Sequence, residues 1–144
     1  MLINLDQRDK RPIYQQIEDQ IVRLCLLEIL KEGDSIPSVR QMAADLSINP
    51  NTVQKAYQEL ESKGVIVTVR GKGNFIGDIS AIRSVRESQI LLNLHETVSD
   101  ARKNGIQREK VLSVVSEIYD EKESLEKDHI IASYDNEKGE IQHD

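Results

Sequence analysis

Residues 38–60 place apolar side chains at helical spacing in two short neighbouring runs. Ser38 and Asn49 each precede one run, and both belong to the residue types that cap helix N-termini. Gln41 completes a capping-box pattern with Ser38, and Pro50 suits the first position of the second helix. The pattern therefore predicts two short helices joined by a tight turn. The apolar stripes are Val39, Met42, Ala43 and Leu46, then Val53, Ala56, Tyr57 and Leu60.

Two helices this short and this closely joined favour a helix-turn-helix, whose second helix enters the DNA major groove. The outward face of that helix carries polar side chains, which suit base edges and phosphates. A solvated helix face is the alternative explanation. The side chains opposite the buried stripe are Asn51, Lys55, Gln58 and Ser62, flanked by Thr52 and Gln54.

A longer amphipathic helix precedes this stretch, with an apolar stripe of Tyr14, Ile17, Ile21 and Leu24. Pro12 suits its first turn, and Gly33 is the expected C-terminal stop, so the helix is predicted to end near Leu30. Residues 33–37 then form a connecting turn. Residues 1–11 are predicted to be an extended lead-in, anchored to a neighbouring surface by Leu2, Ile3 and Leu5.

Gly64 is the expected stop of the second short helix. The β-branched run that follows at residues 65–70 predicts a strand. Residues 74–77 form the returning strand, so the segment is a two-stranded hairpin, or wing. Its tip, Arg70, Gly71, Lys72 and Gly73, combines two cations with a backbone that can approach a phosphate or the minor groove closely. An ordinary hairpin turn with a solvated lysine is the alternative.

Residues 79–126 predict two amphipathic helices separated by a break at Asn104 and Gly105. Two such helices cannot bury both apolar faces alone, so we expect a homodimer through this segment, with packing within one chain as the alternative. Residues 127–144 are polar and acidic and are expected to form a disordered tail. The predicted fold is mainly α with a small β-hairpin: a winged helix-turn-helix over residues 1–78, followed by the two-helix segment.

The net charge of −6 argues against general attraction to nucleic acid. Residues 1–78 are nearly neutral at −1 and residues 79–144 carry −5, so DNA binding would require a local patch. The candidate cations are Arg40, Lys55, Arg70 and Lys72.

No apolar run reaches membrane-spanning length, and the N-terminus lacks a signal-peptide core, so a cytoplasmic location is expected. The single Cys25 cannot form an internal disulfide. His129 and His143 are scattered in the tail, and we expect neither a metal site nor a cofactor. Paired catalytic carboxylates, nucleophile motifs and P-loops are missing, which argues against an enzyme. A protein-interaction adaptor remains open, since the acidic charge favours it.

Three separated motifs, PIYQQIEDQI, EGDSIPSVRQMAADLSINPNTVQKAYQELESKGVI and VRGKGNFI, occur in order over about residues 10–77. In this order they resemble the winged-helix domain of GntR-type bacterial transcription regulators. The short two-helix C-terminal part is similar to that of the YtrA subfamily, since the chain has no room for a larger effector domain.

The resemblance implies DNA-binding roles for individual residues. Arg40 matches the arginine that contacts DNA ahead of the recognition helix. Tyr57 matches an aromatic that is scaffold first and phosphate ligand second. Glu32 and Pro50 depart from the family pattern, and the proline weakens base readout. The full expected set is Ser38, Arg40, Asn49, Asn51, Thr52, Lys55, Tyr57, Arg70, Gly71, Lys72 and Gly73.

The expected function is a homodimeric, sequence-specific repressor that binds double-stranded DNA at an inverted-repeat operator. The resemblance suggests an operator near the protein's own promoter, often in an operon with an ABC-type transporter. With no effector pocket expected, a ligand would bind at the dimer interface or between the domains; its identity is unknown.

Overall fold

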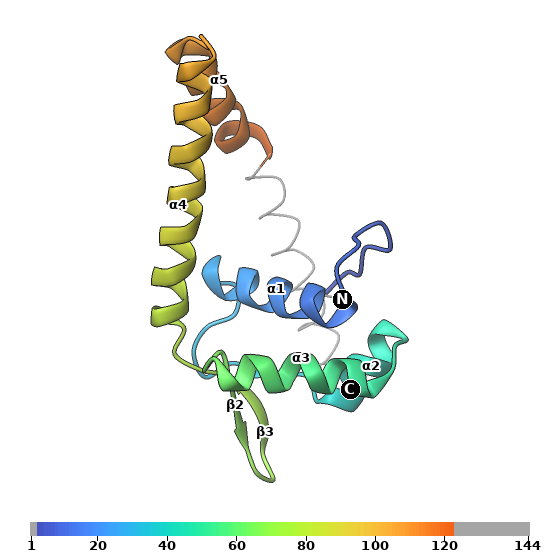
Figure 1. The fold of residues 1–144 in the computed structure, drawn as a ribbon. Coiled ribbons are helices and arrows are strands. Elements are labelled where there is room, and N and C mark those ends of the chain that lie inside the picture. The colour runs from blue at the N-terminus through green and yellow to red at the C-terminus, as the bar shows by residue number, and fades with distance from the viewer. Residues whose placement is uncertain (1–2, 123–144) are drawn as a thin grey trace. The chain divides into compact units, whose positions relative to one another are not determined.

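The computed structural model describes residues 3–122, so Leu2, the expected tail and the last part of the expected two-helix segment, residues 123–126, lie outside the described residues. The chain divides into two compact units between Ile82 and Arg83. A mainly helical chain with one small sheet confirms the predicted fold class (Figure 1). The elements in order are α1 (Ile13–Leu26), β1 (Ser35–Ile36), α2 (Val39–Leu46), α3 (Pro50–Ser62), β2 (Ile66–Val69), β3 (Gly73–Ile76), α4 (Ser80–Lys103), α5 (Arg108–Glu117) and a short π-helix η1 (Ile118–Lys122).

The core of the first unit forms where α3 packs against both α1 and α2. Ile17 and Ile21 of α1 and Val53 and Leu60 of α3 are almost completely buried. The apolar stripes predicted for α1 and α3 therefore do face the core. Burying aliphatic side chains of this size contributes roughly 1.5–3 kcal/mol each, which stabilises the three-helix arrangement.

Both predicted N-caps of the helix-turn-helix are present. Ser38 Oγ accepts a hydrogen bond from the Gln41 backbone N–H at 3.1 Å, and Asn49 Oδ1 accepts one from the Asn51 N–H at 2.9 Å. The reciprocal half of the capping box is replaced by another contact, because the Gln41 side chain donates to Asp45 at 2.7 Å. The two helices therefore begin where the sequence predicted.

The predicted end of α1 is wrong. The helix ends at Leu26 rather than near Leu30, because Glu28 adopts a left-handed conformation with φ 61°. The Ile29 N–H then bonds to the Leu24 carbonyl at 2.9 Å, which is the pattern of a Schellman motif. Gly33 belongs to a later turn, where its N–H bonds to the Ile76 carbonyl at 2.8 Å.

The same motif builds the turn of the helix-turn-helix. Ser47 is left-handed with φ 55°, and the Ile48 N–H bonds to the Ala43 carbonyl at 3.0 Å. Two of the helix ends in the first unit are thus made by residues other than glycine. The predicted stop at Gly64 is confirmed at the end of α3, with φ 80° and a Val65 N–H to Leu60 carbonyl bond of 2.9 Å.

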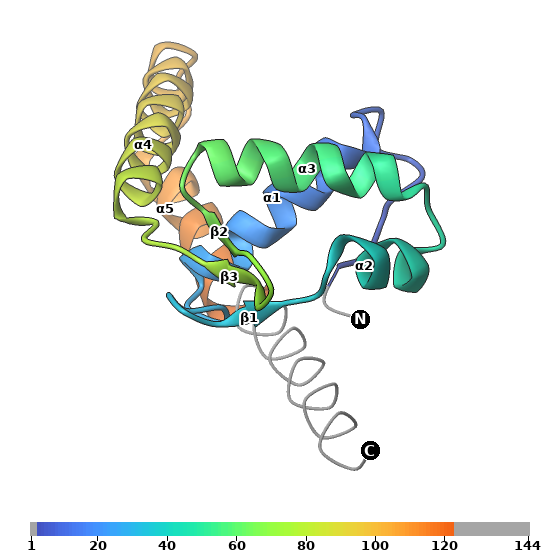
Figure 2. The ribbon, with the colours of Figure 1, turned by 90° about the horizontal axis from the view of Figure 1, so that it is seen from below.

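The sheet has three strands and not the two of the predicted hairpin (Figure 2). Strand order is β1–β3–β2, and both pairings are antiparallel. β1 comes from the segment expected to be only a turn: Ser35 pairs with Phe75 and Ile36 with Asn74. This pairing satisfies one edge of β3 and ties the wing to the chain that leads into α2.

The N-terminal lead-in is held by side chains of α1 and is not extended throughout, because it turns at residues 7–8, where the Asp9 N–H bonds to the Asp6 carbonyl at 3.2 Å. Gln20 exchanges two hydrogen bonds with the backbone of Asn4, at 2.9 and 2.6 Å. Gln16, one turn earlier, does the same with Asp6 at 3.0 and 3.2 Å. The two side-chain amides thus bond to the lead-in backbone as a neighbouring strand would. They keep the lead-in beside α1, where Ile3 is buried in the core.

The second unit contains most of α4 together with α5. The predicted break is confirmed, since Gly105 has φ 77° and the Ile106 N–H bonds to the Ala101 carbonyl at 3.0 Å. Among the described residues, neither α4 nor α5 has a buried side chain. None of the described helices combines the length and apolar character that a membrane span requires.

Candidate nucleic-acid interface

The N-terminal parts of α2 and α3 present the polar side chains expected to meet DNA. Arg40 is exposed on the first turn of α2. Asn51 is exposed and Thr52 half-buried on the first turn of α3. Ser38 and Asn49 are also exposed, and their side-chain oxygens each accept one cap hydrogen bond. The Ser38 O–H and the Asn49 amide N–H₂ group can still donate to a phosphate or a base.

Two lysines on the polar face of α3 contact α1. Lys55, Glu59 and Lys63 lie four residues apart along one line of the helix. This line faces α1, because Lys63 Nζ lies 3.6 Å from Glu18 Oε1 and Lys55 Nζ lies 4.1 Å from the centre of the Tyr14 ring.

Asn51, Gln54 and Gln58 are also exposed on α3, and Asn51 lies one turn before Lys55 on the outward polar face. Gln54 was expected only to flank the site, and it lies in the first half of the helix, where base contacts are usually made. The role of Tyr14 was missed because its spacing from Ile17 made it part of the core stripe. Only the packing of α1 on α3 brings its ring to Lys55.

Tyr57 differs from the other candidates because it is buried. Its side chain is 4% exposed, and its hydroxyl donates a hydrogen bond of 2.7 Å to the Pro37 carbonyl. Burial raises the pKa of the phenol, which stays protonated at neutral pH. Tyr57 therefore joins α3 to the segment between β1 and α2, as a scaffold residue.

The wing tip is the second exposed cationic element. Arg70, Gly71, Lys72 and Gly73 are all exposed between β2 and β3. Gly71 and Gly73 have φ of 78° and 116°, a backbone that side chains other than glycine rarely adopt. The Lys72 N–H closes the turn onto the Val69 carbonyl at 2.9 Å. The tip therefore holds two cations on a narrow loop.

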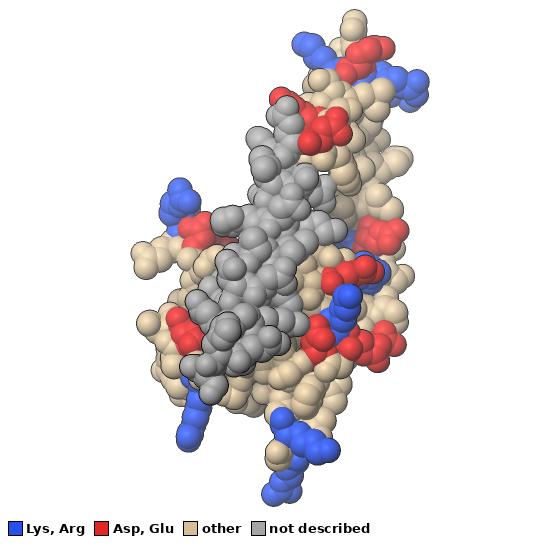
Figure 3. Space-filling view, turned by 180° about the vertical axis from the view of Figure 1, so that it is seen from behind, with Lys and Arg blue, Asp and Glu red and all other residues tan. Residues whose placement is uncertain are grey.

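The charge distribution of the first unit supports a local patch. In Figure 3, Lys and Arg side chains project from the lower end of the molecule, where Figure 1 places the wing. The acidic side chains on this face lie higher. A nearly neutral domain can thus present a positive surface to an anionic partner.

A carboxyl group is buried beneath the α1–α3 seam. Glu18 is 7% exposed, and its Oε1 has no hydrogen-bond partner among the described residues. Burial raises the pKa of Glu18, while the nearby Lys63 ammonium lowers it. Glu59 adds a second carboxyl to the group and raises the pKa further.

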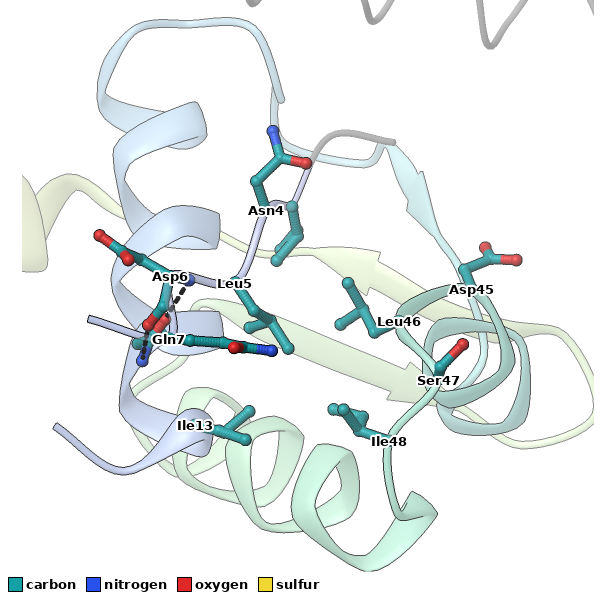
Figure 4. Close-up of a pocket in the computed structure, with 11 residues that line it drawn as sticks. Asn4, Leu5, Asp6, Gln7, Ile13, Asp45, Leu46, Ser47 and Ile48 are labelled. Carbon is teal, nitrogen blue, oxygen red and sulfur yellow. Dashed lines mark hydrogen bonds between the residues drawn. The ribbon is translucent and has the colours of Figure 1, made fainter. Parts of the chain in front are cut away.

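A cavity of about 510 Å³ lies beside the helix-turn-helix turn, where no pocket was expected. Figure 4 shows that Leu5, Ile13, Leu46 and Ile48 point towards one another across it. Its two carboxylates are already engaged, since Asp6 accepts from the Arg8 N–H at 2.9 Å and Asp45 from Gln41 at 2.7 Å. The lining is therefore a mixture of apolar and polar side chains and indicates no particular ligand.

Comparisons with known proteins agree with this geometry. The family of bacterial regulatory proteins named gntR matches residues 13–76. The transcriptional repressor YtrA of Bacillus subtilis is 40% identical over 119 residues, which cover 81% of this chain and 92% of the relative.

Solved structures show the same similarity. A transcriptional regulator from Oenococcus oeni has a TM-score of 0.64 at 36% identity and covers 80% of this chain and 97% of its own. YtrA from Sulfolobus acidocaldarius, a GntR-family transcription factor, has a TM-score of 0.51 at 36% identity and covers 64% of this chain and 99% of its own.

These relatives are regulators and not enzymes, so the exclusion of catalysis is confirmed. Together, the winged helix, its exposed polar helix face and the extended match to YtrA show that this chain is a DNA-binding transcription regulator of the GntR family, of the YtrA type.

Proposed function

We propose that this regulator is a homodimeric repressor in the cytoplasm that binds an inverted-repeat operator near its own promoter. The observation that carries the proposal is the exposed surface formed by α2, the outward side of α3 and the wing. It combines amide side chains, which can pair with base edges, with cations, which can neutralise phosphates.

Each part of this surface has a distinct proposed role. Asn51, Thr52 and Gln54 read bases in the major groove, since the amides of asparagine and glutamine pair well with adenine. Arg40 and Ser38 contact the backbone from α2. Arg70 and Lys72 hold flanking phosphate or the minor groove from the wing, where Gly71 and Gly73 let the backbone approach closely.

Dimerisation is proposed to occur through residues 79–126. Large apolar side chains of α4 and α5 are 39 to 60% exposed, among them Leu94, Val98 and Val115. In the described part of the chain, α4 packs extensively against no other element. Apolar faces of this extent are stable in water when a second copy covers them. Two copies would place two recognition helices on related half-sites.

Repression is the simplest mode of action, because a dimer bound over a promoter excludes polymerase. The B. subtilis relative that covers most of this chain is named a repressor. We further propose that the regulated operon encodes an ABC-type transporter. The effector is left open, and the recess beside the turn adds a third place for it besides the dimer interface and the junction of the units.

The direct test is a gel shift of the full chain with DNA from upstream of its own gene. We expect retardation that weakens steeply as salt increases, because bound phosphates release counterions. A protein-interaction adaptor would show no such binding at low salt, and that result would reject the proposed function.

A single substitution tests the site itself. Arg40→Ala should weaken binding by roughly 1–3 kcal/mol, the usual cost of losing one arginine contact to DNA. Arg40 is exposed, so the thermal midpoint should not change. Arg23→Ala, on an exposed position of α1, is the matched control and should bind as the parent protein does.

A further inference from the structure

One contact of the recognition helix is explained by none of the roles above. Lys55 Nζ lies 4.1 Å from the centre of the Tyr14 ring. This is well inside the roughly 6 Å over which an ammonium group is attracted to an aromatic face. Tyr14 is half-buried on the first turn of α1, whereas Lys55 is exposed. The ring is therefore the fixed surface, and the lysine is the group that it orients.

The contact is part of the α1–α3 seam and not an isolated surface encounter. Tyr14 and Glu18 lie four residues apart on α1, and Lys55 and Lys63 lie on one line of α3. Lys63 Nζ meets Glu18 Oε1 at 3.6 Å, two turns after Lys55 meets the ring. The packing of the two helices thus sets where the Lys55 ammonium lies.

The charge of Lys55 is still available to a partner. Across the residues that the structure describes, Lys55 takes part in no ion pair. An aromatic ring attracts an ammonium group without neutralising it, unlike a carboxylate. A lysine also loses rotamer freedom when it binds a phosphate, and the ring has already restricted that freedom.

We propose that Tyr14 is a positioning residue that turns Lys55 towards the DNA backbone and away from the base edges. This rests on the proposed function and refines it. Lys55 then raises affinity for any duplex and adds one phosphate to the salt dependence. Sequence readout is left to Asn51 and Gln54, which are exposed in the first half of α3.

The test uses the full chain and four variants: Tyr14→Leu, Tyr14→Phe, Lys55→Met and the double variant Tyr14→Leu with Lys55→Met. The probes are the duplex from upstream of the gene and a scrambled duplex of equal length, each titrated at several salt concentrations. Lys55→Met should lower affinity by the same factor on both probes and reduce the salt slope by about 0.9.

Tyr14 should act only through Lys55. Tyr14→Leu should weaken binding about two- to fivefold, the range of an exposed cation–π contact, and should have no effect when Lys55 is already Met. Tyr14→Phe keeps the ring and should bind nearly as the parent protein does. Upfield-shifted Lys55 Hε resonances in the DNA-free protein should persist in Tyr14→Phe and vanish in Tyr14→Leu, and circular dichroism checks that each variant is folded.

Several results would overturn the proposal. An equal loss from Tyr14→Leu with and without Lys55 would mean that Tyr14 acts directly or through folding. A loss from Lys55→Met confined to the upstream duplex would make Lys55 a base reader. Unshifted Lys55 resonances in the parent protein would show that Lys55 does not contact the Tyr14 ring in solution. Salt-insensitive or absent binding of the parent protein, with shifted resonances, would instead reject the proposed function while leaving the contact in place.

Discussion

Glu28 and Ser47 are single residues that decide where helices end. Both adopt left-handed backbone conformations, with φ of 61° and 55°, in positions where Schellman motifs usually have glycine. A side chain in this conformation costs roughly 1 kcal/mol because its Cβ approaches the backbone. Leu30 and Ile48 follow these two residues, and burying them offsets the cost, since Leu30 is in the core and Ile48 is half-buried.

Glu28→Gly should therefore stabilise the protein. We expect a gain of about 0.5–1 kcal/mol in the free energy of unfolding, because glycine removes the strain without disturbing a buried contact. Urea denaturation followed by circular dichroism measures it. Ala44→Gly, on an exposed position inside α2, is the control and should lose a similar amount. A loss in both variants would show that Glu28 contributes more than its backbone conformation.

The buried carboxyl of Glu18 gives a pH dependence with a definite sign. Burial raises the pKa of Glu18 in the folded chain above its value in the unfolded chain. The folded state therefore binds this proton more tightly, so the contribution of Glu18 favours folding below its unfolded pKa. That contribution is lost as the pH rises through the folded pKa.

Glu18→Gln should remove this dependence. At neutral pH we expect the variant to be more stable by about 1 kcal/mol, because an amide is not penalised for burial as a charge is. The difference in free energy of unfolding between the variant and the parent protein should shrink as the pH falls through the folded pKa of Glu18. Urea denaturation at a series of pH values from acid to neutral measures it. Glu61→Gln, on an exposed position of α3, is the control. Its free energy of unfolding should differ from that of the parent protein by the same amount at every pH. A destabilised Glu18→Gln at neutral pH would mean that the Lys63 pair dominates.

At the scale of elements, the base of the wing is held by a close backbone approach. The Gly77 N–H bonds to the Val65 carbonyl at 2.8 Å, so the end of β3 stays beside the start of β2. Gly77 also lies against the Gly64 carbonyl, where an added Cβ would be 2.4 Å from the oxygen. The turn after α3 and the end of the wing therefore fit only with glycine at this position.

Gly77→Ala should destabilise the first unit by roughly 1–3 kcal/mol, the usual cost of an overpacked contact. The thermal midpoint, followed by circular dichroism, measures the effect. Gly71→Ala at the wing tip is the comparison: an added Cβ there meets open space, so only its left-handed backbone costs energy, about 1 kcal/mol. A Gly77 variant as stable as the parent would show that the two segments separate readily.

At the scale of the whole molecule, the main feature is the set of apolar side chains of the second unit that stay exposed among the described residues. Val98 and Leu94 of α4 and Val115 of α5 are among those at least 39% exposed. Since α4 and α5 bury no described side chain, their stability as helices depends on what covers them.

Leu94→Glu should therefore weaken the proposed dimer at least tenfold or so, because it places a charge in an apolar contact that occurs twice in a symmetric pair. Light scattering after gel filtration measures the mass. Gln89→Glu is the matched control and should remain dimeric, because at about 100° per residue it lies on nearly the opposite side of α4 from Leu94. DNA affinity should fall together with dimerisation, and a monomeric parent protein would contradict the proposed interface.

Much of the fold follows from local sequence signals. Ser38, Asn49 and Pro50 fix the starts of α2 and α3, because capping groups satisfy backbone N–H groups nearby in the chain. Gly64 and Gly105 fix helix ends because glycine readily adopts the left-handed backbone that closes a helix C-terminus. Helical spacing of apolar residues identified the core faces of α1 and α3, and three ordered motifs were enough to indicate the family.

Only the tertiary structure decided the rest, since it depends on contacts between distant parts of the chain. β1 pairs with an edge of β3, and α1 ends early where Glu28 adopts a left-handed backbone and Leu30 enters the core. The sequence placed Lys55 on an outward polar face, but packing α1 against α3 brought it to Tyr14. Helical periodicity gives the angle of a side chain around its own axis, whereas its partner depends on which helix lies beside it.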